Sequence, residues 1–213
     1  MARQTWIKLG GVWESLTNIY MKQVGSWLPK VMSWIKVNGV WKQCMYYALS
    51  RSDFFLPSKD EIYLMYTNLH LFGLGGFSST PPTQIYWSSS EMDVYSAYTQ
   101  NFATGSQSGG TKNFDLYSTR ACRSFISPVV YNLREYGPSL GLIFSVTDNG
   151  DSTYTYLECA PSDQTYGVVF SNITDQLAGT NTAVGTGQAN TTAIISQVGH
   201  TTSAAKSCDD LVI

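Results

Sequence analysis

Charged residues are scarce in this chain. Only 13% of its 213 residues are charged, about half the usual share, and the formal net charge is −2. The sequence has no long basic run, which argues against a nucleic-acid-binding protein, because such proteins need Lys and Arg to displace counterions from phosphates. No apolar stretch approaches the roughly 20 residues of a membrane span, so we expect no membrane insertion. The first residues lack the apolar core of a signal peptide.

Residues that commonly carry catalysis or bind metals are also few. The cysteines and histidines are Cys44, Cys122, Cys159, Cys208, His70 and His200. No CxxC spacing occurs, so we expect no metal site, and we interpret the cysteines as free, half-buried thiols rather than a disulfide framework. Neither histidine lies in a recognisable catalytic motif. We therefore expect no catalytic residues and no cofactor.

The polar character comes instead from uncharged groups. Ser and Thr together number 46 and Tyr numbers 14, while hydrophobic residues make up 43% of the chain, enough to bury a core. A polar, aromatic and nearly uncharged surface is typical of a recognition face.

The first 45 residues repeat with a period of 14. The units are residues 6–13, 20–27 and 34–41, and they contain five of the six tryptophans. Each unit is a short alternating run, a turn pair and another run, which predicts a β-hairpin. Isolated hairpins are marginal in water, so these should stack on each other, on the rest of the chain or on other chains. A locally packed β module and an attachment module both fit, but the units resemble repeats of bacteriophage tail proteins, which favours attachment.

The middle of the chain predicts one helix followed by short strands. Ser58 and Glu61 form a capping box, and the apolar residues from Ile62 to Phe72 recur at helical spacing until Gly73. Residues 86–125 are rich in Tyr, Ser, Thr, Asn and Gly, in short alternating pieces that predict strands joined by loops.

The C-terminal third predicts two strands and two short helices. Residues 141–146 and 154–158 read as strands, and the helices are expected at 190–198 and 203–211. The turn at 148–151 lacks the bidentate Glu of a calcium loop, so a hairpin turn is the better interpretation. The Gly-rich residues 176–192 do not match a phosphate loop. The apolar end, residues 211–213, should be buried or paired.

Motifs spread over the chain after residue 50 resemble the Lcl C-terminal domain family, a variant of the C-type lectin fold. The matching segments are 55–61, 86–91, 120–125, 141–144, 158–164, 170–173, 185–190 and 203–208. The first three correspond to the end of the family and the others to its beginning, so the order of the two halves is reversed. The resemblance therefore implies an α+β fold. A β-hairpin repeat module, residues 1–48, precedes a circularly permuted C-type-lectin-like head, residues 49–213, in the chain.

A permutation makes specific demands on the fold. The family's first and last strands are expected to pair beside each other, with residues 126–140 as the bridge between them. The new ends, Arg51 and Ile213, should then lie close together, because permutation is tolerated where the cut falls in an exposed loop. The alternative is that the two halves exchange between protomers.

The resemblance also implies which residues contact a ligand. Members of this class serve as ligand-binding heads, and some are variable proteins of diversity-generating retroelements, in which the stretch after Tyr-Trp-Ser-Ser-Ser-Glu is rewritten. The implied framework residues are Trp87, Ser88, Glu91, Phe102, Gly105 and Arg120. The implied contact set is Met92, Asp93, Tyr95, Ser96, Tyr98, Thr99, Thr104, Ser106, Gln107, Ser108, Asn113, Asp115, Tyr117 and Ser118.

These inferences predict a receptor-binding protein, an adhesin, at the tip of a phage tail. Its partners would be a bacterial surface protein or glycan and, through residues 1–48, other tail proteins; by analogy with tail fibres we expect a homotrimer in the virion. The alternatives are an adhesin or carbohydrate-binding module of the bacterial cell surface and, in another class, an oxidase of the formylglycine-generating type. The chain has no Glu-Pro-Asn or Gln-Pro-Asp triplet for a calcium-dependent sugar site. Recognition should therefore be metal-independent, through aromatic stacking and hydroxyl hydrogen bonds.

Overall fold

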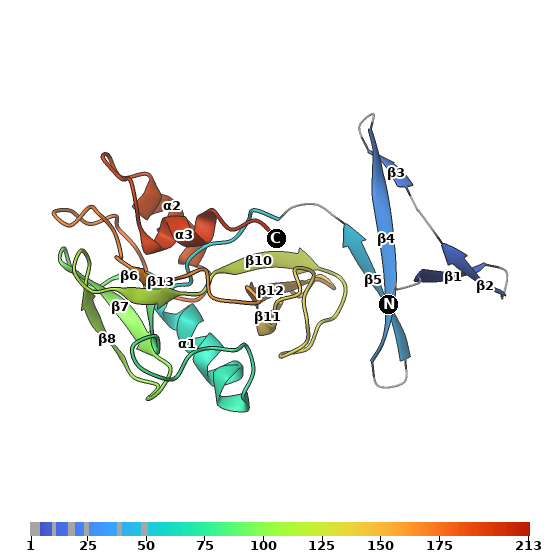
Figure 1. Ribbon diagram of the computed structural model, residues 1–213, viewed down its shortest axis with the longest axis horizontal. Coiled ribbons are helices and arrows are strands. Elements are labelled where there is room, and N and C mark those ends of the chain that lie inside the picture. Colours follow the sequence, from blue (N-terminus) through green and yellow to red (C-terminus); the bar gives the residue numbers. More distant parts are fainter. Residues whose placement is uncertain (1–4, 10–11, 17–19, 24–25, 38–39, 48–50) are drawn as a thin grey trace. The chain divides into compact units, whose positions relative to one another are not determined.

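The chain separates into two compact units, Met1–Ser50 and Arg51–Ile213, in a computed structural model (Figure 1). The structure describes the backbone of residues 5–9, 12–16, 20–23, 26–37, 40–47 and 51–213, and the side chains of residues 51–213. The chain combines α and β structure, with most of the regular elements in sheets. Among the described residues, no helix has the length and apolar character needed to cross a membrane.

The N-terminal unit contains the three strand pairs that the repeat predicts. Its strands are β1 (Thr5–Leu9), β2 (Val12–Leu16), β3 (Tyr20–Gln23), β4 (Ser26–Val37) and β5 (Val40–Tyr47). Strand β1 pairs with β2, and β4 pairs with β3 and β5, all antiparallel. Lys8, Lys22 and Lys36 each lie opposite the Trp five residues later, so the register repeats with the sequence. The central turn residues lie outside the described residues.

The second unit, here called the head, carries α-helices, a 3₁₀ helix and strands. The helical segments are α1 (Lys59–Asn68), the 3₁₀ helix η1 (His70–Phe72), α2 (Gly187–Ile195) and α3 (Ala204–Asp209). The strands are β6 (Ile85–Glu91), β7 (Ser96–Asn101), β8 (Gln107–Thr111), β9 (Tyr117–Thr119), β10 (Cys122–Ser127), β11 (Ile143–Asp148), β12 (Tyr154–Cys159) and β13 (Thr165–Val168).

A five-stranded sheet in the order β13-β9-β6-β7-β8 divides the head into two cores. Side chains of successive strand residues point to opposite faces, so Tyr86 and Trp87 of β6 enter different cores. Tyr86 packs in the cluster that contains Ile62, Met65 and Leu69 of the α1 segment. Trp87 packs in the cluster that contains residues of α2 and α3. Helix α1 therefore covers one face of the sheet, and α2 with α3 covers the other (Figure 1).

The capping box at the start of α1 is confirmed, and Gly73 ends the helical segment as predicted, but the α-helix itself ends earlier than the sequence predicts. The Ser58 amide donates to Glu61 Oε2 at 2.7 Å, and the Glu61 amide donates to Ser58 Oγ at 3.3 Å. The α-helix stops at Asn68, whose side-chain amide donates to the Phe144 carbonyl at 2.9 Å. A 3₁₀ turn follows, which rotates Phe72 out of the core and leaves it exposed. Helices α2 and α3 are likewise shifted or shortened relative to the predicted 190–198 and 203–211.

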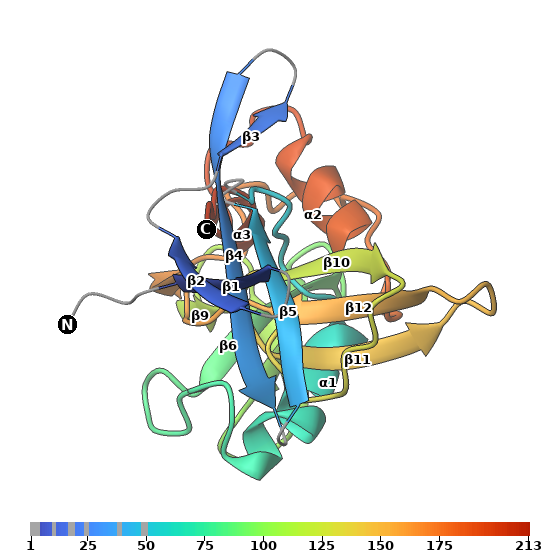
Figure 2. The same cartoon turned by 90° about the vertical axis from the view of Figure 1, so that its right-hand side faces the viewer.

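Strands β10, β12 and β11 form a separate three-stranded sheet, seen in Figure 2. The predicted hairpin of residues 141–158 is confirmed, since Asp148 of β11 lies opposite Tyr154 of β12. The expectation that the first and last strands of the family pattern pair directly is wrong. The first strand of the family pattern corresponds to β11 and the last to β10. Strand β12 lies between these two strands and pairs with both.

The two ends of the head meet. The Arg51 amide donates to the Ile213 carbonyl at 2.8 Å, and the Ile213 amide donates to the Arg51 carbonyl at 3.1 Å. The apolar C-terminal residues are thus paired through the backbone, as the sequence predicts, although Ile213 itself remains exposed. Both halves of the head belong to one chain, so no exchange between protomers is needed to bring these ends together.

Candidate functional site

The predicted contact segment is built on the antiparallel hairpin of β7 and β8. In its register Tyr98 lies opposite Gly109, and Thr99 lies opposite Ser108. Directly opposed residues share a face and successive residues alternate, so these two pairs lie on opposite faces of the hairpin. The predicted set is therefore divided between the face that carries Tyr98 and the opposite face, which carries Thr99 and Ser108.

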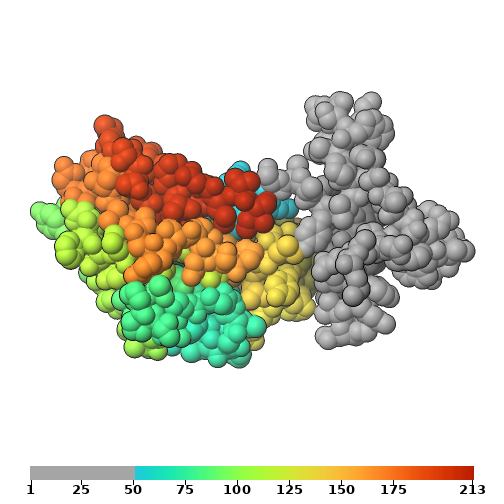
Figure 3. Space-filling view, in the orientation of Figure 1, coloured from blue at the N-terminus to red at the C-terminus, as the bar shows by residue number. Residues whose placement is uncertain are grey.

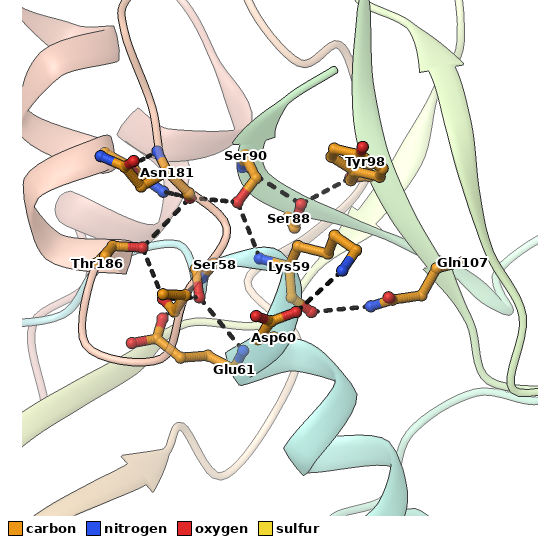
Figure 4. Close-up of polar contacts among 12 residues, drawn as sticks. Ser58, Lys59, Asp60, Glu61, Ser88, Ser90, Tyr98, Gln107, Asn181 and Thr186 are labelled. Atoms are coloured by element: carbon orange, nitrogen blue, oxygen red, sulfur yellow. Dashed lines mark hydrogen bonds and ion pairs between the residues drawn. The ribbon is translucent and has the colours of Figure 1, made fainter.

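The first surface is the face on the side of α1, here called the α1-side face. It carries Ser96, Tyr98 and Gln107 from the predicted set. Gln107 Nε2 donates to the Lys59 carbonyl at 2.8 Å, and Lys59 Nζ lies 5.6 Å from the centre of the Tyr98 ring (Figure 4). Lys59 Nζ also pairs with Asp60 at 3.0 Å. The α1-side face thus combines an aromatic ring, a cation and an amide.

Lys59 was missed by the sequence analysis. It is the first residue of α1, directly after the capping Ser58, where the sequence predicts a helix start and a family-like segment but no ligand contact. The position of a helix start relative to a distant hairpin cannot be read from spacing, because Lys59 and Tyr98 belong to elements far apart in the chain. The backbone amide of Lys59 donates to Ser90 Oγ at 2.9 Å, which fixes the helix start against β6.

The turn between β6 and β7 extends this face. Met92 lies across the hairpin, because a side chain added at Gly109 would place its Cβ 3.2 Å from Met92 Sδ. Asp93 Oδ1 accepts hydrogen bonds from the amides of Tyr95 and Ser96, both at 2.8 Å. Hydrogen bonding from Ser96 and Tyr95 lowers the pKa of the Asp93 carboxyl. Asp93 therefore shapes the turn, and Tyr95 stands out from it with 73% of its surface exposed.

The turn between β7 and β8 is stabilised by its own polar side chains. Asn101 Oδ1 accepts from the amides of Ala103 and Thr104, at 2.8 and 3.3 Å. The hydroxyls of Thr104 and Ser106 lie 2.8 Å apart, and both residues are exposed. Gly105 has a φ of +78°, a backbone conformation that L side chains rarely adopt.

The turn after β8 holds two exposed apolar residues that the prediction left out. Asp115 Oδ2 accepts from the Thr111 amide at 2.6 Å and so fixes the turn, while Asn113 is exposed. Phe114 is 79% exposed and Leu116 is 53% exposed. Phe114 lies in the stretch from which the sequence predicts strands joined by loops, and it is not in the predicted contact set. Its place in a turn, which only the fold decides, makes it a candidate contact.

Two predicted contacts are buried, and a third, Tyr117, is half-buried against the core. Thr99 is 2% exposed and its hydroxyl donates to the Ser108 carbonyl at 3.1 Å. Ser118 is 1% exposed and its hydroxyl donates to the Thr83 carbonyl at 2.9 Å. The Tyr117 ring packs against Trp87, with ring centres 4.8 Å apart, and burial raises the pKa of its hydroxyl. The first two are too buried to touch a ligand, and Tyr117 supports the sheet.

A buried ion pair holds the hairpin from beneath. Lys112 Nζ lies 2.8 Å from Glu91 Oε1, and the two side chains are 0% and 4% exposed. Glu91 also accepts from the amides of Ala178 and Gly179. The Lys112 amide donates to the Tyr95 carbonyl at 2.9 Å, so the pair is tied to the turn that presents Tyr95.

Four other framework residues, Trp87, Ser88, Phe102 and Arg120, are also buried. Trp87 Nε1 donates to the Val168 carbonyl, and Ser88 Oγ donates to the Tyr98 carbonyl, both at 2.8 Å. Arg120 is 1% exposed; its Nε pairs with Asp163 at 2.7 Å. Phe102 lies in the core on the side of α1. The bonds of Trp87 and Ser88 tie β6 to β13 and β7.

The segment before α2 lies beside the hairpin. Ser90 Oγ donates to the Asn181 carbonyl at 2.7 Å (Figure 4). Glu61 Oε1 accepts from the Gly185 amide at 2.8 Å. Burial raises the pKa of the Glu61 carboxyl. In Figure 3 the green hairpin segment and the orange segment before α2 occupy the same end of the head. Leu177 and Val184 are exposed on this second segment.

The cysteines of the head differ in burial from what the sequence predicts. Cys122, Cys159 and Cys208 are free and fully buried rather than half-buried, and Cys44 has no described side chain. Cys122 of β10 lies directly opposite Cys159 of β12, a pairing that the sequence did not show. Burial raises the pKa of both thiols, so neither is poised as a nucleophile.

The histidines serve the packing of helix ends. The His200 ring nitrogen Nε2 lies 2.9 Å from Ser203 Oγ, the hydroxyl that accepts from the Lys206 amide and caps α3. Burial lowers the pKa of His200. His70 packs against the rings of Tyr66 and Phe102. Within residues 51–213, no group of three or more His, Cys, Asp or Glu side chains is placed to hold a metal ion.

Comparison of the chain with models of protein families, with curated proteins and with solved structures finds no match.

Proposed function

We propose that this protein is a phage tail-tip adhesin whose head recognises a bacterial surface ligand through the α1-side face and the neighbouring turns. The observation that carries the proposal is the hairpin β7–β8. The hairpin carries the half-buried Tyr98, the turn before it carries the exposed Tyr95, and the buried Glu91–Lys112 pair lies at the base of both. A recognition surface gains affinity when its contact residues are held in place before binding.

The composition of this surface favours direct recognition without a metal ion. Tyr95 and Tyr98 provide aromatic faces, and Gln107 and Ser96 provide hydrogen-bonding groups beside them. Tyr side chains offer a large contact area at low cost in conformational entropy. Sugars stack on such rings and protein surfaces pack on them, so the same face suits a surface glycan or a surface protein.

Two further features support the proposed C-type-lectin-like architecture. The hydrogen bonds between Arg51 and Ile213 bring the ends of the head together, which a circular permutation requires. Of the framework residues that the resemblance implies, Trp87, Ser88, Phe102 and Arg120 are buried, as is the side chain of Glu91. The register of the N-terminal hairpins repeats with the 14-residue period, as in a module that stacks on copies of itself. We assign residues 1–48 to attachment to other tail proteins and to trimer formation.

Binding of the purified full chain to bacterial cells, to a glycan array and to extracted surface proteins tests the proposal. Tyr95→Ala and Tyr98→Ala should each weaken binding at least 10-fold, because a buried aromatic contact typically contributes more than about 1.4 kcal/mol. Tyr136→Ala is the matched control, since Tyr136 is 68% exposed but lies in the segment between β10 and β11. Tyr117 is unsuitable as a binding probe because it packs on Trp87.

The outcomes separate the possible functions. Binding that survives both hairpin substitutions, or that Tyr136→Ala weakens equally, would refute the proposed face. Binding through the face without incorporation of the chain into phage particles would favour a bacterial surface adhesin or carbohydrate-binding module. A trimer in light scattering supports the assembly role of residues 1–48, and a monomer of the full chain contradicts it.

A further inference from the structure

Two of the buried thiols share one core. Cys122 and Cys159 belong to the cluster on the side of α1, whereas Cys208 belongs to the cluster formed with α2 and α3. All three are at most 1% exposed. The strand register places Cys122 and Cys159 directly opposite each other, so their side chains lie on the same face of the sheet.

The hydrogen bonds around these residues define the geometry of the pair. Cys122 exchanges both of its backbone hydrogen bonds with Phe55, at 2.8 and 2.9 Å, on the edge of β10 away from β12. The Cys159 amide donates to the Leu142 carbonyl at 3.0 Å, on the side of β11. Neither backbone bonds to the other, so the cysteines form a non-hydrogen-bonded pair. Such pairs have Cα atoms about 4.5 Å apart, which is within the range of about 4.4–6.8 Å that a disulfide spans.

We propose that Cys122 and Cys159 form a cross-strand disulfide when the protein meets a small-molecule disulfide oxidant. The bond would join β10 to β12, and therefore the two halves of the head whose order is reversed relative to the family pattern. It is flanked by the buried ion pair of Arg123 and Glu158, which lie opposite each other at the next position. This inference does not depend on the proposed binding function.

The reaction is a thiol–disulfide exchange in two steps. The thiolate of one cysteine attacks a sulfur of oxidised glutathione, breaks its S–S bond and releases one glutathione thiolate. The thiolate of the second cysteine then attacks the protein sulfur of this mixed disulfide and releases the second glutathione. The protein loses two protons and two electrons, and one oxidised glutathione takes them up to become two thiols. Burial raises the pKa of both cysteines, so exchange requires a transient opening of the core.

Mass spectrometry of the full chain tests the pairing directly. Trypsin separates the four cysteines into the peptides 43–51, 121–123, 135–206 and 207–213. The chain is purified under reducing conditions and exposed to oxidised glutathione in two ways, while folded and during refolding from urea. The expected product joins peptide 121–123 to peptide 135–206, with a loss of two hydrogens, and dithiothreitol separates it again.

Thermal unfolding gives an independent measurement. Closing a loop of about 40 residues should raise the Tm of the head by roughly 10 °C. Cys122→Ala and Cys159→Ala should each abolish this rise, whereas the equally buried Cys208→Ala should keep it. A dominant cross-link to peptide 207–213 or 43–51, stable glutathione adducts on single cysteines, or no 121–123 to 135–206 cross-link in either arm would overturn the proposal.

Discussion

Replacing Lys112 by Met should destabilise the head strongly while leaving the volume of its core almost unchanged. Lys112 is fully buried, and its Nζ lies 2.8 Å from a Glu91 oxygen that is itself nearly inaccessible. Met has a similar length, so the cavity term is small, but Glu91 keeps a buried charge without its cation. Breaking a buried pair in this way costs about 3–5 kcal/mol. For a domain of this size, that corresponds to a fall in Tm of roughly 6–20 °C.

A double-mutant cycle isolates the pair from other effects. Glu91→Gln alone leaves the Lys112 charge unpaired, and its cost should be similar to that of Lys112→Met. The double variant should be less destabilised than the sum of the two by about 2 kcal/mol or more, because neither buried charge remains. The amide oxygen of the substituted side chain can still accept from the Ala178 amide, which Glu91 bonds in the native chain.

Urea or thermal unfolding followed by circular dichroism measures these costs. Lys206→Met is the control, since Lys206 and Asp210 form an exposed pair at 2.7 Å and its loss should leave Tm almost unchanged. A cost below about 1 kcal/mol for Lys112→Met would refute the reasoning, because it would mean that water reaches Glu91. Ligand binding should weaken together with stability, because the buried pair holds the backbone of Lys112, whose amide donates to the Tyr95 carbonyl.

Three further predictions concern packing and pH. Gly110→Ala should lower the free energy of unfolding by about 1–3 kcal/mol, because the added Cβ would lie 2.6 Å from the Trp87 ring. Gly109→Ala is the control, since its Cβ meets mainly the flexible end of Met92. Equal unfolding midpoints for the two variants would contradict this prediction. Tyr117→Ala should cost about 1–3 kcal/mol in the same assay, and Tyr95→Ala less than about 0.5 kcal/mol, because only the first packs on Trp87. Burial raises the pKa of Glu61, so the folded state binds a proton at higher pH than the unfolded state does. The contribution of Glu61 to stability should therefore fall as pH rises from about 4.5 through the folded pKa. Glu61→Gln should lack this fall when Tm is measured from pH 4 to 7. A Tm profile of Glu61→Gln that parallels the native one would count against that assignment.

The sequence was most informative where a pattern is local. The capping box of Ser58 and Glu61 correctly predicted the start of α1, because its hydrogen bonds join residues three positions apart. The 14-residue period and its two-residue turns correctly predicted three strand pairs with a repeating register. The strands between residues 86 and 125 were also predicted, since the alternation of side-chain types along a strand can be read from the sequence alone.

The candidate site was predicted as a segment but not as a surface. Alternation says that Tyr98 and Thr99 point in opposite directions, but it does not say which direction another element covers. Thr99 and Ser118 are buried and Phe114 is exposed for that reason. Lys59 reaches Tyr98 only because α1 packs on the same face of the sheet.

By itself, then, the sequence determined the local elements, the repeating module and the stretch that carries the exposed aromatic and polar residues. Tertiary structure alone decided which of these residues face solvent, that Lys112 pairs with Glu91 beneath them, and that Cys122 lies opposite Cys159. It also brought Arg51 and Ile213, the two ends of the head in the sequence, within hydrogen-bonding distance of each other. The physical reason is that burial and pairing depend on contacts between residues far apart in the chain, and spacing within a segment does not specify them.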